Sequence, residues 1–306
     1  MKITLVENFR AMFYTPFYAT AELGAYEAEG LDVEMMTSTA FGEANRMLAS
    51  GAAEVSWGGP MRLMLARDAD PNASTVAFCE VVGRDPFFLI GRTPKPDFQM
   101  KDLLGKTVAT VSEVPTPWVA LQHDLRAAGI DPAAVNRITG RTMGDNAAAL
   151  RAGEVDVIQV FHPLARTLVD EGAGHLWYAA SSRGLACYTT LNTTREFVAR
   201  YPEVVLGITR AVYRTQKWIA AHDGRDLAEV VARFLPDIPQ PVLAACCNEY
   251  KASEVWSRRP TVQRAGLEWK REAMLSSGSI GKRLAYEDYV DASFAEQVVR
   301  EDPPSI

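Results

Sequence analysis

Cysteine is scarce in this sequence, whose 306 residues include Cys79, Cys187, Cys246 and Cys247. No CxxC motif occurs, and the adjacent pair could join only through a strained ring. No two of the four histidines stand at the i, i+4 spacing that would let one helix present both to a metal ion. The sequence therefore predicts neither a disulfide framework nor a metal site, and it gives no indication of a cofactor.

Basic charge and long apolar runs are also lacking. Lys and Arg number 32 against 38 Asp and Glu, so the formal net charge is −6. A nucleic-acid binder needs clustered basic residues, and no apolar run approaches the roughly 20 residues that span a bilayer. Residues 1–7 carry one Lys and read as a short strand, without the features of a signal peptide. We therefore expect no nucleic-acid partner, no membrane insertion and no signal peptide in this sequence.

What is present is an alternation of β-rich runs with amphipathic segments, which is typical of an α/β fold. The chain after residue 195 reads almost wholly as helix. The predicted strands are residues 3–7, 31–36, 55–57, 74–82, 87–90, 107–111, 155–160, 175–179 and 187–191. The predicted helices are residues 16–28, 42–49, 60–68, 117–128, 145–152 and 163–171.

An internal repeat runs through the first 165 residues. Residues 48–55 (LASGAAEV) resemble residues 150–157 (LRAGEVDV) at an offset of 102. Residues 30–32 (GLD) resemble residues 129–131 (GID) at an offset of 99. In each copy Gly is expected to end a helix in the left-handed conformation.

Four prolines follow the same spacing. Pro16, Pro60, Pro117 and Pro163 stand where predicted helices begin, a position that Pro fits because its missing N–H would be unpaired there. The offsets from Pro16 to Pro117 and from Pro60 to Pro163 are 101 and 103. Helix starts alone would explain each Pro, but the shared offset favours a duplication.

The repeat predicts two similar α/β lobes. In open α/β sheets ligands bind where strands end and helices begin, because backbone N–H groups and helix dipoles there favour negative charge. We expect two such edges to form a cleft that closes by a hinge motion. The expected first lobe is residues 1–90 plus 188–306, with a helical C-terminal part, and the second is residues 91–187. Two crossover strands would join them.

Four stretches of the first 165 residues carry a family resemblance. They are residues 16–19 (PFYA), 22–33 (ELGAYEAEGLDV), 102–109 (DLLGKTVA) and 150–157. They resemble type II periplasmic solute-binding proteins of the branch that binds sulfonates, nitrate or thiamine-pyrimidine precursors. The resemblance implies a two-lobed periplasmic-binding-protein-like II fold that binds a small molecule. From the candidate site residues given below we expect this molecule to be at least partly aromatic or anionic. The resemblance also implies an ABC transporter permease as partner and a periplasmic location.

The resemblance leaves an enzymatic interpretation open. Residues 281–285 (GKRLA) and 288–290 (DYV) resemble a stretch of the eukaryotic-type thiamine-pyrimidine synthase. Its clustered cysteines would fall near Cys187, which stands alone, and its reactive His near Arg62, where no His occurs. A desulfinase on this fold uses a Cys after the first strand, and residues 8–15 contain none. We predict a binding protein without catalytic residues. A cytoplasmic enzyme or sensor on the same fold is the alternative.

Candidate ligand-binding residues of the first lobe lie after its predicted strands. The loop after the first strand is rich in side chains that stack or donate hydrogen bonds. The third strand ends in a Trp and two glycines, which offer a stacking surface and close backbone approach. A tight turn with a core Trp would leave the same pattern. The predicted residues are Arg10, Tyr14, Thr15, Trp57, Gly58 and Gly59.

The second lobe and the crossovers supply the remaining candidates. Hydroxyls and helix N–H groups near residues 112–118 would hold an anionic oxygen, and helix capping is an equal alternative. The His that ends a later strand is either a ligand group or a satisfied structural residue. For Arg84 the alternatives are an anionic ligand and a hinge ion pair. The predicted residues are Glu80, Arg84, Ser112, Thr116, Trp118, Phe161, His162 and Tyr188.

Overall fold

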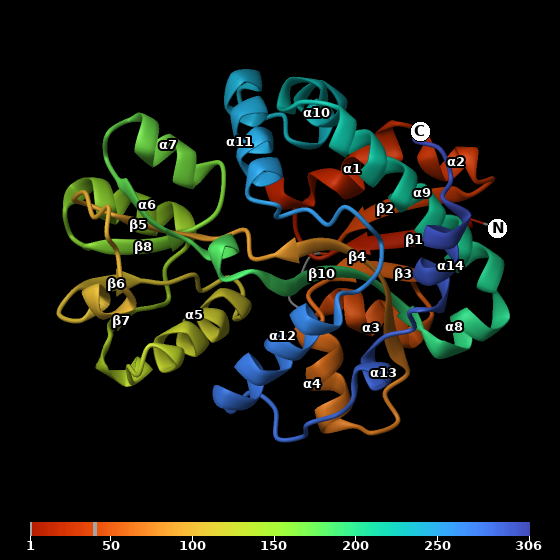
Figure 1. Ribbon diagram of the computed structural model, residues 1–306, viewed down its shortest axis with the longest axis horizontal. Helices are drawn as coiled ribbons and strands as arrows, with labels where there is room; N and C mark the ends of the chain where they lie inside the picture. The colour runs from red at the N-terminus through yellow and green to blue at the C-terminus, as the bar shows by residue number, and fades with distance from the viewer. Residues whose placement is uncertain (1, 39–41) are drawn as a thin grey trace. The chain divides into compact units, whose positions relative to one another are not determined.

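The computed structural model describes residues 2–38 and 42–306, which fold into two units (Figure 1). Unit 1 contains Met1–Asp85, Leu185–Arg271 and Ile280–Ile306, and unit 2 contains Pro86–Gly184 and Glu272–Ser279. The expected limits at residues 90 and 187 differ slightly from these. The strand after Pro86 pairs inside unit 2, and the strand that starts at Leu185 pairs inside unit 1.

Unit 1 is built on a five-stranded mixed sheet with the order β2-β1-β3-β10-β4. Strand β1 pairs in parallel with β2 and β3, and β10 runs antiparallel to β3 and β4. Hydrophobic side chains of β1, β3 and β4 are almost fully buried, as expected for strands covered on both faces. The strands are β1 (Lys2–Glu7), β2 (Asp32–Thr37), β3 (Val55–Gly58), β4 (Thr75–Arg84) and β10 (Leu185–Thr194).

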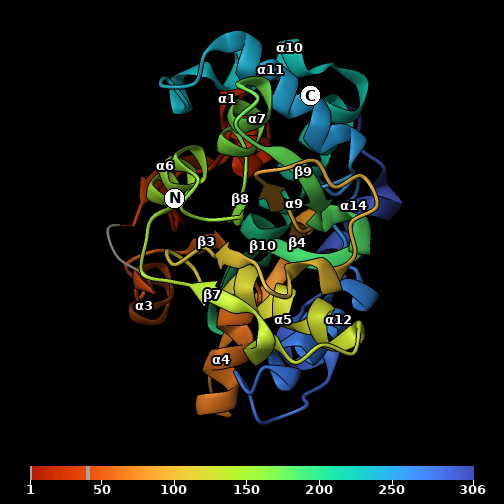
Figure 2. The ribbon, with the colours of Figure 1, turned by 90° about the vertical axis from the view of Figure 1, so that its left-hand side faces the viewer.

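Helices cover both faces of this sheet (Figures 1 and 2). Helices α1 (Thr15–Glu22), α2 (Ala25–Ala28) and α9 (Pro202–Ala221) lie on one face, and α3 (Glu43–Ser50) and α4 (Met61–Ala69) lie on the other. The predicted helical character of the C-terminal part is confirmed. Its other helices are α8 (Arg195–Arg200), α10 (Gly224–Val231), α11 (Gln240–Ala252), α12 (Arg264–Ser276), α13 (Tyr286–Tyr289) and α14 (Ser293–Glu301).

Unit 2 repeats the plan with the strand order β7-β6-β8-β5-β9. Strands β6 (Thr107–Ala109), β7 (Asn136–Ile138) and β8 (Val157–Val160) are parallel, and β5 (Phe88–Gly91) runs antiparallel to β8 and β9 (His175–Ala179). Helix α5 lies on one face of the sheet, and α6 and α7 lie on the other (Figures 1 and 2). These helices are α5 (Thr116–Ala127), α6 (Met143–Ala152) and α7 (Leu164–Asp170).

The predicted repeat is confirmed at its glycines. Gly30 and Gly129 have φ of 72° and 75°, and Gly51 and Gly153 have φ of 72° and 75°. A side chain would strain this left-handed backbone, which explains why Gly occurs at the same step of both copies.

The prolines also occupy matching positions. Pro16 and Pro117 are the second residues of α1 and α5, whereas Pro60 and Pro163 immediately precede α4 and α7. Pairs related by the repeat thus start their helices in the same way, so the spacing reflects one duplicated plan rather than isolated helix starts.

A hydrogen bond from a strand backbone to an acidic side chain also occurs in both units. The carboxylate of Glu54 accepts a hydrogen bond from the backbone N–H of Thr4 at 2.7 Å, at the start of β1. The carboxylate of Asp156 accepts one from the N–H of Thr107 at 2.9 Å, at the start of β6. In each unit an acid just before the third parallel strand satisfies a backbone donor of the neighbouring strand.

Two features of the fold were not predicted. Strand β7 has three residues at the exposed edge of its sheet, too few for a hydrophobic alternation to be visible. Helix α12 begins in unit 1, and its last residues, from Glu272, belong to unit 2, so it adds a connection beyond the two crossover strands. Among the described residues, no helix combines the length and apolar character required to cross a membrane.

Candidate functional site

The edge of unit 1 where its parallel strands end is organised around buried Glu7. Its carboxylate accepts hydrogen bonds from the Tyr18 hydroxyl at 2.8 Å, the Thr37 hydroxyl at 2.6 Å and Arg10 Nε at 2.8 Å. Arg10 also lies over the Tyr18 ring, 5.1 Å from its centroid. The structure thus gives Arg10 an internal partner of opposite charge, and a role in ligand binding stays a prediction.

An aromatic cluster packs in the interior of unit 1, next to the loop that follows β1. Trp57 is fully buried, and its ring stacks on Phe17 with centroids 4.3 Å apart and planes 8° apart. Tyr14 meets Trp57 edge-on at 5.8 Å. The predicted stacking surface of Trp57 is therefore covered by Phe17, which corresponds to the alternative of a core Trp. Thr15 is also buried and donates its hydroxyl to the Met12 carbonyl at 2.7 Å.

Arg62, in the first turn of α4, is a cation at this edge that sequence reasoning did not select as a binding residue. Its guanidinium donates to Asn8 Oδ1, and Asn8 Nδ2 in turn donates to the Trp57 carbonyl at 2.6 Å. Burial lowers the pKa of Arg62, while the nearby Tyr14 and Tyr188 oppose that effect. A partly desolvated guanidinium held in place by an amide is suited to bind an anionic oxygen.

The two glycines after Trp57 permit this arrangement. A Cβ on Gly58 would come 2.6 Å from Asn8 Nδ2, and one on Gly59 would come 3.3 Å from the Tyr188 carbonyl. Gly58 therefore leaves room for the Asn8 side chain to reach the end of β3. The sequence signal that could have identified the site was an Asn directly after the first strand together with an Arg shortly after Gly-Gly.

Two buried tyrosines neighbour Arg62. Tyr14 is 3% exposed and Tyr188 is 5% exposed, and burial raises the pKa of the Tyr14 hydroxyl, so this phenol is neutral at physiological pH. Phe13 meets the Tyr188 ring edge-on at 5.6 Å, and the ammonium of buried Lys270 lies 5.1 Å from the centroid of that ring. The edge thus combines positive charge with phenol groups.

Glu80 forms a separate polar cluster beside Cys187, the residue that precedes Tyr188. Its buried carboxylate accepts hydrogen bonds from the Ser257 hydroxyl at 2.8 Å and from the Gln263 N–H at 3.3 Å, and it also contacts the Cys187 thiol. Burial raises the pKa of Glu80 to about 7 and that of Cys187 well above its ordinary value. Cys187 is thus a poor thiolate nucleophile. Arg84 forms an ion pair with Glu254 at 2.5 Å, as in the hinge alternative.

In unit 2 the corresponding edge is closed by its own polar contacts. The Ser112 hydroxyl accepts from the Gly140 N–H at 2.8 Å, and the Glu113 carboxylate accepts from the Met143 N–H, at the start of α6, at 2.7 Å. Thr116 is the first residue of α5, which has no side-chain cap. Sequence reasoning missed Glu113. Its carboxylate accepts from the N–H of Met143, which lies 30 residues away in the sequence, so the contact exists only in the folded chain.

The aromatic candidates of unit 2 take part in ring contacts. The Arg137 guanidinium lies 4.1 Å from the centroid of the Trp118 ring. His162 is 2% exposed, and its ring centroid is 4.6 Å from that of Phe88. Phe161 meets Phe87 edge-on at 5.2 Å. His162 is thus a buried residue in this structure, and its role as a ligand group stays a prediction.

The groups described at these edges are suited to contact a ligand. Arg62 and the phenols of unit 1 offer donors and aromatic surface, and burial disfavours the thiolate of Cys187. Within residues 2–38 and 42–306, no group of three or more His, Cys, Asp or Glu side chains is arranged to hold a metal ion.

Comparisons with known proteins agree with the fold and the motifs. The model of the family described as "NMT1/THI5 like" matches residues 12–225. The Bacillus subtilis (strain 168) protein named "Putative binding protein YtlA" is 23% identical over 302 residues, which are 98% of this chain and 90% of that protein. The resemblance predicted from the sequence is thereby confirmed.

Solved structures show the same fold at low identity. The periplasmic aliphatic sulphonate binding protein SsuA from Escherichia coli superposes with a TM-score of 0.76 at 14% identity, covering 94% of this chain and 97% of that one. The desulfurization enzyme DszB superposes with a TM-score of 0.72 at 14% identity, covering 98% and 100%. The predicted periplasmic-binding-protein-like fold is confirmed, and it is one that receptors and an enzyme share.

Proposed function

Because the chain belongs to the NMT1/THI5-like family, we propose that it is a solute-binding receptor that delivers a small molecule to an ABC importer. The names of its relatives support this role, since YtlA is called a binding protein and SsuA a sulphonate binding protein. A periplasmic location and a permease partner follow from the same proposal.

The ligand that the proposal favours is a small anion with an aromatic or apolar part. The observation that carries it is the position of Arg62, half-buried beside Tyr14 and Tyr188 and held by Asn8. A guanidinium in such surroundings gains most from an anionic partner, because a desolvated charge interacts more strongly than one in water. Phenol rings add apolar contact surface and hydroxyl groups for orientation.

The proposal includes closure of the two units on the ligand. Its support is the path of the chain, which passes between the units at Asp85–Pro86 and at Gly184–Leu185 through short connections, besides the passages within and after α12. Short connections that absorb backbone rotation are the usual hinges of two-domain receptors. Ser112 and Trp118, at the carboxyl edge of the unit 2 sheet, are the side chains that we would assign to the ligand from that unit.

An enzymatic role like that of DszB receives no support from the cysteines. Cys187, next to Tyr188 in the sequence, is buried beside Glu80 with a raised pKa. Residues 8–15, after the first strand, contain no Cys. A thiolate nucleophile would need exposure and a lowered pKa instead.

A ligand screen by thermal shift tests the proposal. Sulfonates, nitrate, aromatic acids and aminopyrimidines are added to the purified protein, and a true ligand raises Tm because it binds only the folded chain. Arg62→Gln should weaken binding of an anionic ligand by about tenfold or more, since a charge-assisted hydrogen bond is lost. Arg67→Gln, on the same helix, is the matched control and should leave affinity unchanged.

Two results would count against the proposal. If no compound of these classes raises Tm, the receptor role loses its support. If Arg62→Gln and Arg67→Gln bind an identified anion equally well, Arg62 is removed from the site and the receptor role stands by itself. Circular dichroism of both variants checks that loss of the Asn8 contact has not unfolded unit 1.

A further inference from the structure

The first residues of β10 are irregular, and they lead directly to the proposed ligand site. The chain leaves unit 2 at Gly184, and β10 begins at the next residue. Its pairing with β4 shifts register between Leu185 and Thr189, so the strand bulges around Cys187. Tyr188, which follows Cys187, is one of the phenols of the ligand site. The bulge therefore sets where the Tyr188 side chain starts.

Cys187 has a backbone conformation that its surroundings must hold. Its φ is 41°, in the left-handed region that a residue with a Cβ adopts only at a cost. Helix α12 packs closely against this backbone, since a Cβ on Gly266 would come 2.9 Å from the Cys187 nitrogen. The thiol is fully buried and donates a hydrogen bond to the Glu80 carboxylate. This bond anchors the side chain of the strained residue to β4.

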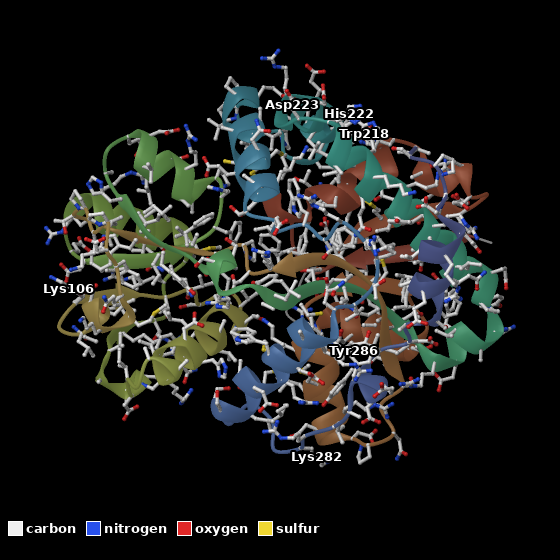
Figure 3. The ribbon with its side chains drawn as sticks, viewed as in Figure 1. Lys106, Trp218, His222, Asp223, Lys282 and Tyr286 are labelled. Atoms are coloured by element: carbon white, nitrogen blue, oxygen red, sulfur yellow. The ribbon has the colours of Figure 1, made fainter. Side chains whose placement is uncertain are left out.

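Titratable groups on four elements face this cluster. Cys79 precedes Glu80 on β4 and Cys187 stands on β10, and burial raises the pKa of both thiols. Tyr286, on α13 (Figure 3), faces Glu80 and Cys187, and burial raises the pKa of its phenol. Lys270, on α12, adds a cation near Cys187. Burial raises the pKa of Glu80 to about 7, so its charge changes near neutral pH while these thiols and this phenol stay neutral.

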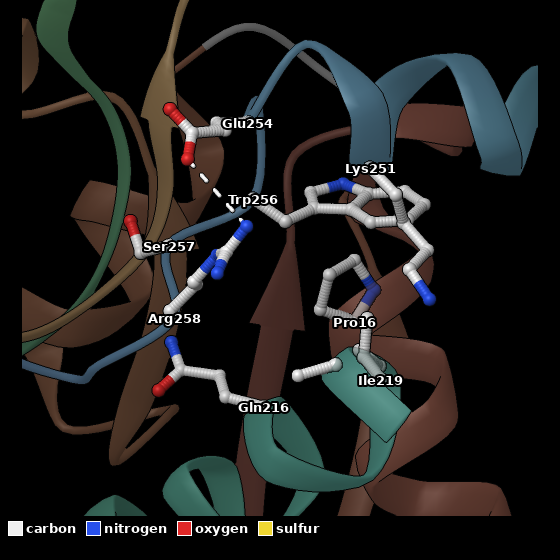
Figure 4. A pocket seen from close by; sticks show the side chains of 9 residues that line it. Pro16, Gln216, Ile219, Lys251, Glu254, Trp256, Ser257 and Arg258 are labelled. Carbon is white, nitrogen blue, oxygen red and sulfur yellow. Dashed lines mark ion pairs between the residues drawn. The ribbon is translucent and has the colours of Figure 1, made fainter. Parts of the chain in front are cut away.

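The Glu80 carboxylate is surrounded by donors. Besides the Cys187 thiol, the Ser257 hydroxyl donates to it at 2.8 Å and the Gln263 N–H at 3.3 Å. Ser257 lies on the segment that follows α11 (Figure 4), where its N–H donates to the Val81 carbonyl at 2.9 Å. An ionised carboxylate can accept from all three donors, whereas a protonated one carries an O–H that faces them. Protonation should therefore displace the weakest donor, which is the thiol.

Tyr188 connects this cluster to the ligand site. Its ring is 5% exposed, meets Phe13 edge-on at 5.6 Å, and has the Lys270 ammonium 5.1 Å from its centroid. Its phenol lies near Arg62, whose pKa it raises against the effect of burial. Because Cys187 and Tyr188 share one planar peptide, a backbone rotation at Cys187 moves the start of the Tyr188 side chain. In this close packing such a movement changes the contacts of the ring.

We propose that Glu80 is a positioning residue for the ligand site: its ionised carboxylate holds the bulge at Cys187, and with it the Tyr188 ring, in the form that binds an anion. Protonation of Glu80 releases the thiol, and the affinity for the anion falls. This inference rests on the proposed function, because Tyr188 is assigned to the ligand there. Glu80 itself makes no contact with the ligand.

Nuclear magnetic resonance on the ¹⁵N-labelled full chain tests the positioning without any ligand. The Gln263 amide signal reports the charge of Glu80, because this N–H donates to the carboxylate. We expect the Tyr188 amide signal to shift with the same midpoint, at a pH of about 7. Both shifts should disappear in Glu80→Gln, which has no proton to lose at this position.

Cysteine variants test the path from Glu80 to Tyr188. Cys187→Ala removes the thiol, so the Gln263 signal should still titrate while the Tyr188 signal no longer follows it. Cys79→Ala, which changes the buried Cys on the other side of the bulge's partner strand, should leave both titrations in place. Should Cys187→Ala fail to fold, the unmodified chain and Glu80→Gln still decide whether Tyr188 responds to the charge of Glu80.

Binding of benzenesulfonate gives the functional readout, because the charge of this anion is constant over the range used. Calorimetric titration should show about three- to tenfold weaker binding at about pH 5.5 than at about pH 8.5, the loss expected of one hydrogen bond. Glu80→Gln lacks the charge of the carboxylate, so at both pH values it should bind as the unmodified chain does at the lower pH. Other groups titrate in both proteins, so the difference between them isolates Glu80.

Three results would overturn the proposal. If the Tyr188 signal does not titrate together with the Gln263 signal, the bulge does not respond to Glu80. If Tyr188 still titrates in Cys187→Ala, the thiol does not position it. If benzenesulfonate binds more tightly at the lower pH, and Glu80→Gln removes this difference, the carboxylate acts by repelling the anion. Failure of benzenesulfonate to bind at any pH would count against the proposed ligand class instead, and the resonance titrations then decide the role of Glu80 by themselves.

Discussion

Replacement of the buried Glu80 by Gln should change how stability depends on pH. Burial raises the pKa of this carboxyl from an ordinary value of 4.5 to about 7 in the folded protein. The folded chain therefore holds the proton more tightly than the unfolded chain does. The contribution of Glu80 to the free energy of unfolding is fully present below pH 4.5, falls as the pH rises, and is lost once the pH is above 7.

The size of this effect follows from the two pKa values. A pKa difference of about 2.5 corresponds to about 3 kcal/mol between the two ends of the window. Glu80→Gln has no proton to lose at this position, and its amide retains an oxygen that can accept from Ser257. Relative to the original chain, the variant should therefore gain about 3 kcal/mol as the pH rises from 4.5 to above 7.

Urea unfolding at a series of pH values measures this difference directly. Other groups titrate in both proteins, so the difference between the two unfolding free energies isolates Glu80. Glu287→Gln serves as a control of opposite sign, because Arg264 lowers the pKa of that exposed carboxyl. A difference between Glu80→Gln and the original chain that stays constant with pH would refute the reasoning, since it would mean that Glu80 titrates alike in both states.

Two glycine substitutions give further predictions. Gly91→Ala should destabilise unit 2 by about 1–3 kcal/mol or more, because the new Cβ would overlap the Trp177 ring; thermal unfolding checks this, and an unchanged Tm contradicts it. Gly58→Ala should displace the Asn8 amide and weaken ligand affinity more than it lowers Tm, since its Cβ would lie 2.6 Å from Asn8 Nδ2. A variant with normal affinity would show that the Asn8 contact does not position the site.

The fold could be predicted largely because its signals are local. Gly51 and Gly153 end helices with a conformation that other residues rarely adopt, and their spacing revealed the repeat. Strand β7 was not predicted, because three residues are too few to show the alternation of apolar and polar residues that is typical of a strand. A helix end or a strand is determined mainly by residues close together in the sequence. One sequence is therefore enough to predict such elements.

The candidate site was less predictable because its geometry depends on distant contacts. Arg62 is positioned by Asn8, 54 residues away. An Asn after the first strand and an Arg after Gly-Gly are visible in the sequence, but they do not indicate that the two side chains pair. Trp57 illustrates the opposite case, since a Trp before two glycines suits an open pocket or a packed core equally well. Only the stacking of Phe17, supplied by another helix, distinguishes the two.

The duplicated carboxylates of Glu54 and Asp156 have an evolutionary consequence. Each acid secures a strand of its own half. Strand order in either half is thus fixed independently of the loops that lie at the opposite end of its sheet. Selection can rewrite those loops in one copy for a new solute while the sister copy keeps its ancestral form, so specificity in such chains can diversify one half at a time.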